Sequence, residues 1–203
     1  MSQYTVLTGD VIKSRDYDNV REILNNSFKK VKYPKNVITP FQISRGDEIQ
    51  AVFKNYIPFP KLIRQIRYEL LPLEIRFGIG FGEINEDINQ DNSWNMNGTA
   101  FYNARKALKI VDENRTFYTQ FVSNSKIDEA INTILYLIDT LEKEWTDAQW
   151  EAIYYYEKKG TYKKAAKELD IAFQNVEKRC RAAKWKEVNF AENSIEKILK
   201  NFC

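Results

Sequence analysis

The chain has 203 residues, of which 43% are hydrophobic and 29% are charged, and this composition indicates an ordinary globular protein of one or two domains. It contains no histidine and two cysteines, Cys180 and Cys203, which excludes Ser–His and Cys–His catalysis, most zinc sites and a disulfide framework. Any metal would therefore be held by carboxylates and carbonyls, which favours magnesium or manganese.

The sequence predicts a protein without a membrane segment. No apolar run approaches the roughly eighteen residues that a membrane helix needs. Residues 1–9 also lack the basic start and the long apolar run of a signal peptide. We therefore expect a cytoplasmic protein.

The first 124 residues alternate between patterns typical of strands and of helices. Short apolar or alternating runs predict strands over residues 3–9, 37–45, 48–53, 74–84 and 116–123. Apolar residues at three- and four-residue steps predict helices over residues 16–31, 59–71 and 98–111. The order β-α-β-β-α-β-α-β indicates an α+β fold, a ferredoxin-like sandwich with helices on one face of its sheet.

Three glycines mark the strand over residues 74–84. Gly78, Gly80 and Gly82 recur at period two, so they share one face of that strand. A strand face without side chains permits another element to approach closely. We expect such an approach here.

A long amphipathic helix is predicted for the connecting segment, residues 125–145. Its apolar residues follow steps of four and three without a break, and they are Ile127, Ile131, Ile134, Ile138, Leu141 and Trp145. This is the a/d pattern of a helix that packs along one seam. The seam either covers the sandwich or forms a dimer, and the pattern does not decide between them.

Residues 146–203 have the pattern of an all-α helix-turn-helix domain. Thr146 and Gln149 form a capping box at the start of a first helix, and Gly160 is placed to end it. Thr161 is the predicted cap of a short second helix, and a third helix begins near Phe173. Two short helices joined by a three- or four-residue turn are the helix-turn-helix unit.

The same module carries most of the positive charge. Residues 158–186 contain ten Lys or Arg and three Asp or Glu, a local net charge of +7, which marks a contact for a polyanion. The residues expected on the exposed face of the third helix are Gln174, Asn175, Lys178, Arg179, Arg181 and Lys184. Amides read base edges and cations hold phosphates, so double-stranded DNA is the expected partner. The alternative is a protein-binding cap with a solvated basic face.

The segment GTYKKAAKELDIAFQNVEKRCRAAK resembles the region-four helix-turn-helix of sigma factors. This resemblance covers about forty residues and also implies DNA binding.

Two aspartates stand at strand ends in the first domain. Asp10 follows the first strand and Asp47 lies in the turn of the next hairpin, and this topology places the two strands side by side. Both carboxylates are expected to converge on one Mg²⁺ or Mn²⁺. Turn chemistry is the better explanation of either aspartate alone, and the metal site becomes an equal alternative only because two of them stand at matching strand ends. The residues expected to contact the phosphates of a nucleotide-like ligand, through backbone amides or positive charge, are Val11, Ser14, Arg15 and Arg45.

The motifs TGDVIKSR, SRGDEIQA, IRFGIGFGEI and NGTAFYNARKAL together resemble the SatD family, small bacterial proteins that end in a helix-turn-helix. Their positions are similar to those of the class III nucleotidyl cyclase palm, and this resemblance implies the metal role for Asp10 and Asp47. The cyclase Asn and Arg that stabilise the transition state correspond to Tyr102 and Lys106. We count Lys106 among the nucleotide contacts and assign no catalytic residue.

The sequence thus predicts a palm-like domain over residues 1–124, the connecting helix over 125–145 and a helix-turn-helix domain over 146–203. The first interpretation is a DNA-binding regulator, expected as a homodimer, whose palm senses a metal-bound nucleotide. The alternative is a nucleotidyl cyclase or another phosphoryl-transfer enzyme acting at a dimer interface. A third possibility is that the palm is an inert dimerisation scaffold.

Overall fold

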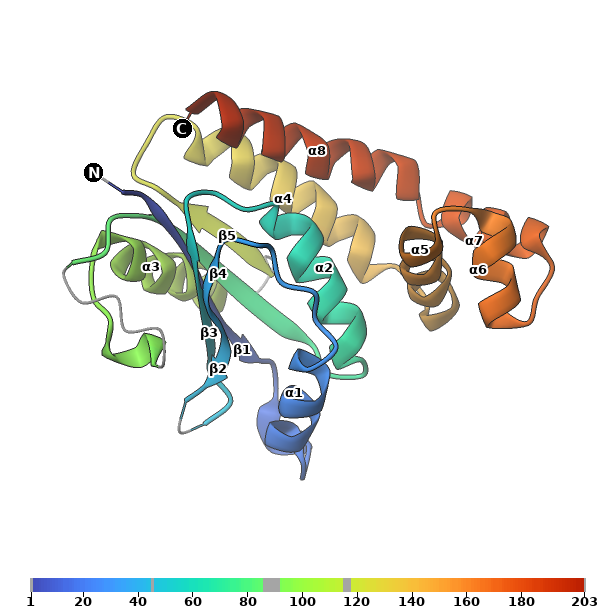
Figure 1. Cartoon of the computed structure of the whole chain (residues 1–203), viewed down its shortest axis with the longest axis horizontal. Helices are drawn as coiled ribbons and strands as arrows, with labels where there is room; N and C mark the ends of the chain where they lie inside the picture. Colours follow the sequence, from blue (N-terminus) through green and yellow to red (C-terminus); the bar gives the residue numbers. More distant parts are fainter. Residues whose placement is uncertain (1, 45, 86–91, 115–117, 203) are drawn as a thin grey trace.

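The computed structural model describes residues 2–44, 46–85, 92–114 and 118–202 and shows one α+β molecule (Figure 1). Its five-stranded sheet has the order β2-β3-β1-β4-β5. The strands are β1 (Tyr4–Val11), β2 (Val37–Ile43), β3 (Ile49–Lys54), β4 (Ile75–Gly82) and β5 (Thr119–Val122).

The topology is ferredoxin-like with one added strand. The central strand β1 runs antiparallel to both β3 and β4, and β2 pairs with β3 as a hairpin. The helices α1 (Val20–Phe28) and α2 (Phe59–Leu70) make the two crossovers of this unit. After β4, the helix α3 (Thr99–Asn114) leads to β5, which pairs parallel to β4 at the edge. The predicted order of strands and helices is confirmed.

Helices cover both faces of the sheet, which corrects the expectation of helices on one face. Successive strand residues point to opposite sides, so Leu7 joins the large core under α1 and α2, whereas Val6 joins a smaller core. That smaller core contains Ala100, Phe101 and Ala104 of α3. The second face is covered because α3 comes after the four-stranded ferredoxin unit and packs on the side of the sheet opposite to α1 and α2.

The glycine face of β4 is the surface on which α3 lies. A Cβ on Gly78 would stand 2.4 Å from the Ala104 carbonyl oxygen, and one on Gly80 would stand 2.0 Å from the Ala100 carbonyl oxygen. Both distances are far inside van der Waals contact, so only glycine permits this helix–strand approach. The expected close approach is confirmed, and its partner is a helix of the same chain.

The rest of the described chain is helical. The helices are α4 (Asp128–Lys143), α5 (Asp147–Lys159), α6 (Tyr162–Leu169), α7 (Phe173–Ala182) and α8 (Trp185–Phe202). In Figure 1, α5, α6 and α7 form a group at one end of the molecule, and α8 runs back along α4. Among the described helices, none is long and apolar enough to cross a membrane.

The seam of α4 packs within the chain. Ile131, Ile138 and Trp145 are buried in the same core as the sheet and α2, and α8 contributes Val188 and Ile195 to that core. The seam therefore covers the sandwich, which is the first of the two predicted alternatives. One continuous core joins the palm to the C-terminal helices.

Candidate functional site

The helix-turn-helix is formed by α6, a three-residue turn and α7. Thr161 caps α6 by accepting a hydrogen bond from the Lys164 amide at 3.2 Å. Asp170 ends α6 in the left-handed conformation, with φ of 51°, and so redirects the chain into α7. Upstream, Gly160 with φ of 77° ends α5, and the Gln149 side chain accepts from the Thr146 amide at 2.8 Å. The predicted caps are confirmed.

A small core fixes the angle between these helices. Ala165 and Ala166 of α6 are buried, and their size permits close helix crossing. They meet Val176 and Cys180 of α7, which are also buried. Burial raises the pKa of the Cys180 thiol to about 11, so this thiol serves packing and not reactivity.

The opposite face of α7 is open to solvent and carries the predicted DNA residues. Gln174, Asn175, Lys178 and Arg181 are exposed on α7, whereas Arg179 is partly buried. Lys184, which was predicted on the same helix, is exposed but lies beyond the end of α7, where its φ of 56° turns the chain toward α8. In the part of the chain that the structure describes, no carboxylate lies within ion-pair distance of Lys178, Arg181 or Lys184. Their positive charge is therefore available to an external anion.

Exposed lysines of α6 extend this basic surface. The sequence predicted them as part of the local positive charge but not as members of the site. Lys163, Lys164 and Lys167 are exposed. Lys163 lies 5.8 Å from the centroid of the Phe173 ring, at the first residue of α7. The cations of α6 thus border the helix end that carries Gln174 and Asn175.

The predicted metal residue Asp10 is held by an arginine of the neighbouring strand. Arg76 Nε donates to Asp10 Oδ1 at 2.5 Å, and a second guanidinium nitrogen donates to Oδ2 at 2.9 Å. Asp112 of α3 binds the same guanidinium at 2.6 Å. The hydrogen bond to Asp10 raises the pKa of Arg76 above its ordinary value. Because both Asp10 oxygens are engaged by a cation, this arrangement does not fit a divalent metal.

The other predicted palm residues are only partly brought together. β1 pairs with β3 as expected, and the partly buried Asp47 lies in the turn just before β3. Val11 is buried, and Ser14 and the exposed Arg15 lie in a short 3-10 turn. Arg45 lies outside the described residues.

Lys106 lies at the opposite end of the sheet. Its ammonium group is 3.4 Å from the side-chain oxygen of Asn124, just beyond β5. The register places Tyr4 beside Gly82 at that end and Val11 beside Ile75 at the other. Strands rise about 3.3 Å per residue, so roughly 20 Å separates the two ends. Within one chain, Lys106 and Asp10 do not share a site.

Comparison with known proteins agrees with this architecture. Residues 4–196 match the sequence profile of the SatD family, which spans the sheet, the connecting helix and the helix-turn-helix together. The chain belongs to the SatD family. A comparison with curated proteins returns no match.

Two solved structures are weakly similar to this SatD family member. One is a bacterial light-regulated adenylyl cyclase, which is 13% identical and covers 59% of this chain and 75% of its own, with a TM-score of 0.37. The other is a regulator of polyketide synthase expression from Bifidobacterium adolescentis, 12% identical over 98% of this chain and 86% of its own, with a TM-score of 0.27. At these scores neither likeness bears on function.

In this SatD family member, buried ion pairs join the palm to the C-terminal helices. Arg64 of α2 donates from Nε to Glu192 of α8 at 2.8 Å and from a terminal nitrogen to Glu157 of α5 at 2.6 Å. Its guanidinium also lies 4.4 Å from the centroid of the Trp185 ring. Burial alone would lower the pKa of Arg64, but the two carboxylates outweigh it and raise the pKa. Sequence patterns gave no sign of this cluster.

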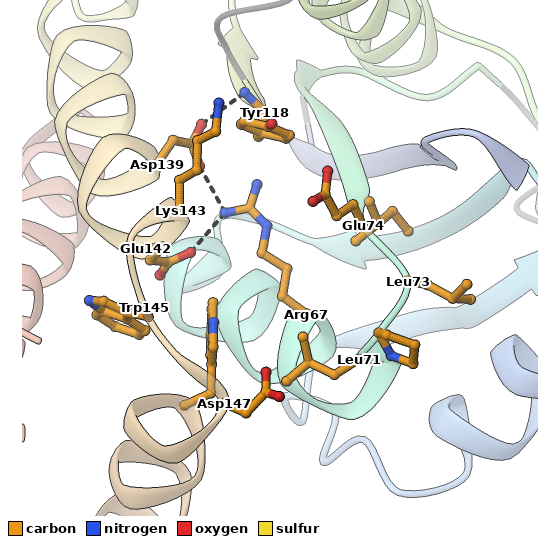
Figure 2. A pocket seen from close by; sticks show the side chains of 13 residues that line it. Arg67, Leu71, Leu73, Glu74, Tyr118, Asp139, Glu142, Lys143, Trp145 and Asp147 are labelled. Atoms are coloured by element: carbon orange, nitrogen blue, oxygen red, sulfur yellow. Dashed lines mark hydrogen bonds and ion pairs between the residues drawn. The ribbon is translucent and has the colours of Figure 1, made fainter. Parts of the chain in front are cut away.

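A second arginine of α2 binds the connecting helix. One terminal nitrogen of Arg67 donates to Asp139 and to Glu142, each at 2.8 Å (Figure 2). The other donates to Thr119 at 2.7 Å. The Tyr118 amide donates to the second oxygen of Asp139 at 3.1 Å. Burial raises the pKa of Glu142 to about 7, although Arg67 and Arg64 lower it. α2 is therefore the element through which the palm contacts α4, α5 and α8.

Proposed function

We propose that this SatD family member is a DNA-binding regulator that contacts duplex DNA through α6 and α7. The observation that carries the proposal is the exposed face of α7, which presents two amides in its first turn and uncompensated cations beyond them. In helix-turn-helix proteins the first residues of the recognition helix meet base edges in the major groove. Gln174 and Asn175 occupy those positions, and amides are suited to adenine.

The cations are arranged to hold the DNA backbone on both sides of those amides. Lys178 and Arg181 follow along α7, Lys184 lies just beyond its end, and Lys163 and Lys167 lie on α6. Phosphate contacts of this kind supply affinity and position the reading helix without selecting a sequence. The amides therefore account for sequence specificity and the cations for affinity, so the two properties can be tested separately.

The affinity test is a fluorescence anisotropy titration of labelled duplex DNA at fixed salt. We expect Lys178→Ala and Arg181→Ala each to weaken binding several-fold on every duplex, because each removes a phosphate contact. The matched control is Lys109→Ala on α3, which removes an exposed positive charge from another surface. If all three variants lose affinity equally, or if none of them loses affinity, the assignment of the DNA contact to α7 is wrong.

The specificity test is a selection from a randomised duplex pool. Wild-type protein is expected to enrich one sequence class, and Gln174→Ala with Asn175→Ala should flatten that preference while leaving non-specific binding in place. If the double variant enriches the same sequences as the wild type, other residues read the bases.

The palm is proposed as the regulatory part, but the structure gives its metal site no support. Mg²⁺ or Mn²⁺ with a nucleotide at Asp10 and Asp47 remains a prediction, and it requires Arg76 to leave the Asp10 carboxylate. The enzymatic alternative has less support still, since Tyr102 is an exposed tyrosine and Lys106 lies at the far end of the sheet. A homodimer also remains a prediction, and it needs a surface other than the buried seam of α4.

A further inference from the structure

A cavity of about 250 Å³ lies where the palm, the connecting helix α4 and the start of α5 meet (Figure 2). One side is formed by Arg67 of α2 and by Leu71 and Pro72, which follow that helix. The other side is formed by Glu142 of α4 and by Trp145, which precedes α5. A site at this position contacts all three parts of the chain at once.

The lining of the cavity has an excess of acidic groups. Four carboxylates line it and two cations do, and they are Glu74, Asp139, Glu142, Asp147, Arg67 and Lys143. Arg67 is already shared between Asp139 and Glu142. The remaining negative charge favours a positively charged occupant.

Glu142 has an oxygen whose hydrogen-bonding capacity is unused. Its Oε2 accepts from Arg67, whereas Oε1 is buried and has no partner among the described residues. A buried acceptor without a donor costs free energy. Glu142 lines the cavity, so a donor that enters it can meet Oε1 while Oε2 stays on Arg67.

The wall beside Glu142 is aromatic. Trp145 and Trp150 meet edge to face with ring centroids 4.7 Å apart, and Tyr118 lines the cavity as well. Leu71, at 38% exposure, stands at the solvent side. Aromatic faces beside a carboxylate are suited to a cation with an apolar body.

We propose that this cavity is a binding site for a small organic cation, an amine or amidine attached to an aromatic or aliphatic body. The cationic N–H groups donate to the free oxygen of Glu142, and the body lies against Trp145 and Trp150. The site is separate from the palm edge around Asp10 and from the DNA face of α7.

Occupancy of the cavity is linked to the recognition helix through Trp145. The indole Nε1 donates to the Ala183 carbonyl oxygen at the end of α7, at 2.7 Å. A ligand that shifts Trp145 therefore shifts the residue that ends the DNA-reading helix. This regulatory part rests on the proposed DNA function, whereas the binding site itself does not.

Binding is tested on the full chain at about pH 8, where the Glu142 carboxyl is ionised, with 2-phenylethylamine and benzamidine as probes and with tryptophan fluorescence and calorimetry as readouts. We expect saturable binding of at least one of these cations and roughly tenfold weaker binding of the neutral 2-phenylethanol, because the charge-assisted hydrogen bond is lost. Absence of saturation by both cations, or equal binding of the alcohol, overturns the proposal.

Two variants test whether the probe binds in the cavity. Glu142→Gln should weaken binding of the cation roughly tenfold, while Glu144→Gln, an exposed neighbour, should leave it unchanged. Leu71→Trp fills the solvent side from an exposed position and should also block binding, so the test survives if Glu142→Gln fails to fold. Undiminished binding by the folded variants overturns the proposal.

The regulatory part has its own readout. DNA affinity is measured with and without a saturating cationic probe, and we expect it to change at least about fivefold, the low end of ordinary allosteric coupling. If the probe binds and DNA affinity is unchanged, the coupling is wrong. If the probe binds and no DNA is bound at all, the DNA function fails and the cation site stands.

Discussion

At the scale of single residues, Gly80 shows how strictly the fold limits one position. An added Cβ would meet backbone atoms of Ala100 and Ala104, which cannot rotate away. We expect Gly80→Ala to lower the free energy of unfolding by about 3 kcal/mol or more through overpacking. Gly46→Ala is the matched control, since nothing lies within 4 Å of its added Cβ. Urea denaturation checks both, and equal stability of the two variants would contradict the packing of α3 on β4.

Glu142 predicts a pH dependence of stability at the same scale. Burial raises its pKa to about 7, with Arg67 and Arg64 opposing and Asp139 and Glu192 adding to the rise. The stability from the neutral carboxyl is present below the unfolded pKa and is lost as the pH rises through 7. The free energy of unfolding of Glu142→Gln, minus that of wild type, should therefore increase from about pH 5 to about pH 8. Parallel pH curves for the two proteins would show that Glu142 stays ionised.

Asp10 gives a third residue-scale prediction, on metal binding. Arg76 and the metal compete for the same carboxylate oxygens, so millimolar Mg²⁺ or Mn²⁺ should leave the melting temperature of the wild type unchanged. A metal-dependent rise in the melting temperature that is lost in Asp10→Asn would contradict this and restore the metal site.

At the scale of elements, α2 holds the C-terminal helices by buried charge. Arg64→Met leaves Glu192 and Glu157 without their buried partner, and we expect it to cost about 3–5 kcal/mol of unfolding free energy. Lys61→Met removes a cation from the same helix and the same Glu157, but Lys61 is 51% exposed, so its loss should cost at most about 1 kcal/mol. Thermal melts distinguish them, and similar melting temperatures would show that the Arg64 cluster contributes little.

Local patterns predicted the elements well and their long-range partners poorly. The spacing of apolar residues located the strands, and the residues Thr146, Gly160 and Thr161 located the caps of α5 and α6, because both signals depend on neighbours in the chain. The helix α8 was not predicted. The same spacing left two alternatives for the α4 seam, packing on the sandwich or forming a dimer, because an apolar stripe shows that a helix face is buried but not which element buries it. The Arg64 cluster joins residues more than ninety positions apart, and α8 returns along α4 only after three intervening helices, α5 to α7. Such contacts leave no periodic signal.

At the scale of the whole molecule, a candidate site that lies within one helix could be predicted from the sequence, whereas a site built from several elements could not. The exposed basic face of α7 was predictable because its residues lie within one helix, where burial of Val176 and Cys180 decides which side is exposed. The palm site required residues from several elements to converge. Arg76, one strand away from Asp10, was not anticipated as its partner, and Lys106 lies at the other end of the sheet.

The measurement that tests the central claim most directly is the salt dependence of DNA binding. If α6 and α7 hold DNA phosphates, the logarithm of the binding constant falls linearly with the logarithm of salt concentration, with a slope of about −0.9 per contact. The double variant Lys178→Ala, Arg181→Ala should reduce that slope by about two, whereas Lys109→Ala should not change it. Binding that does not depend on salt, or a slope unchanged in the double variant, would contradict the account.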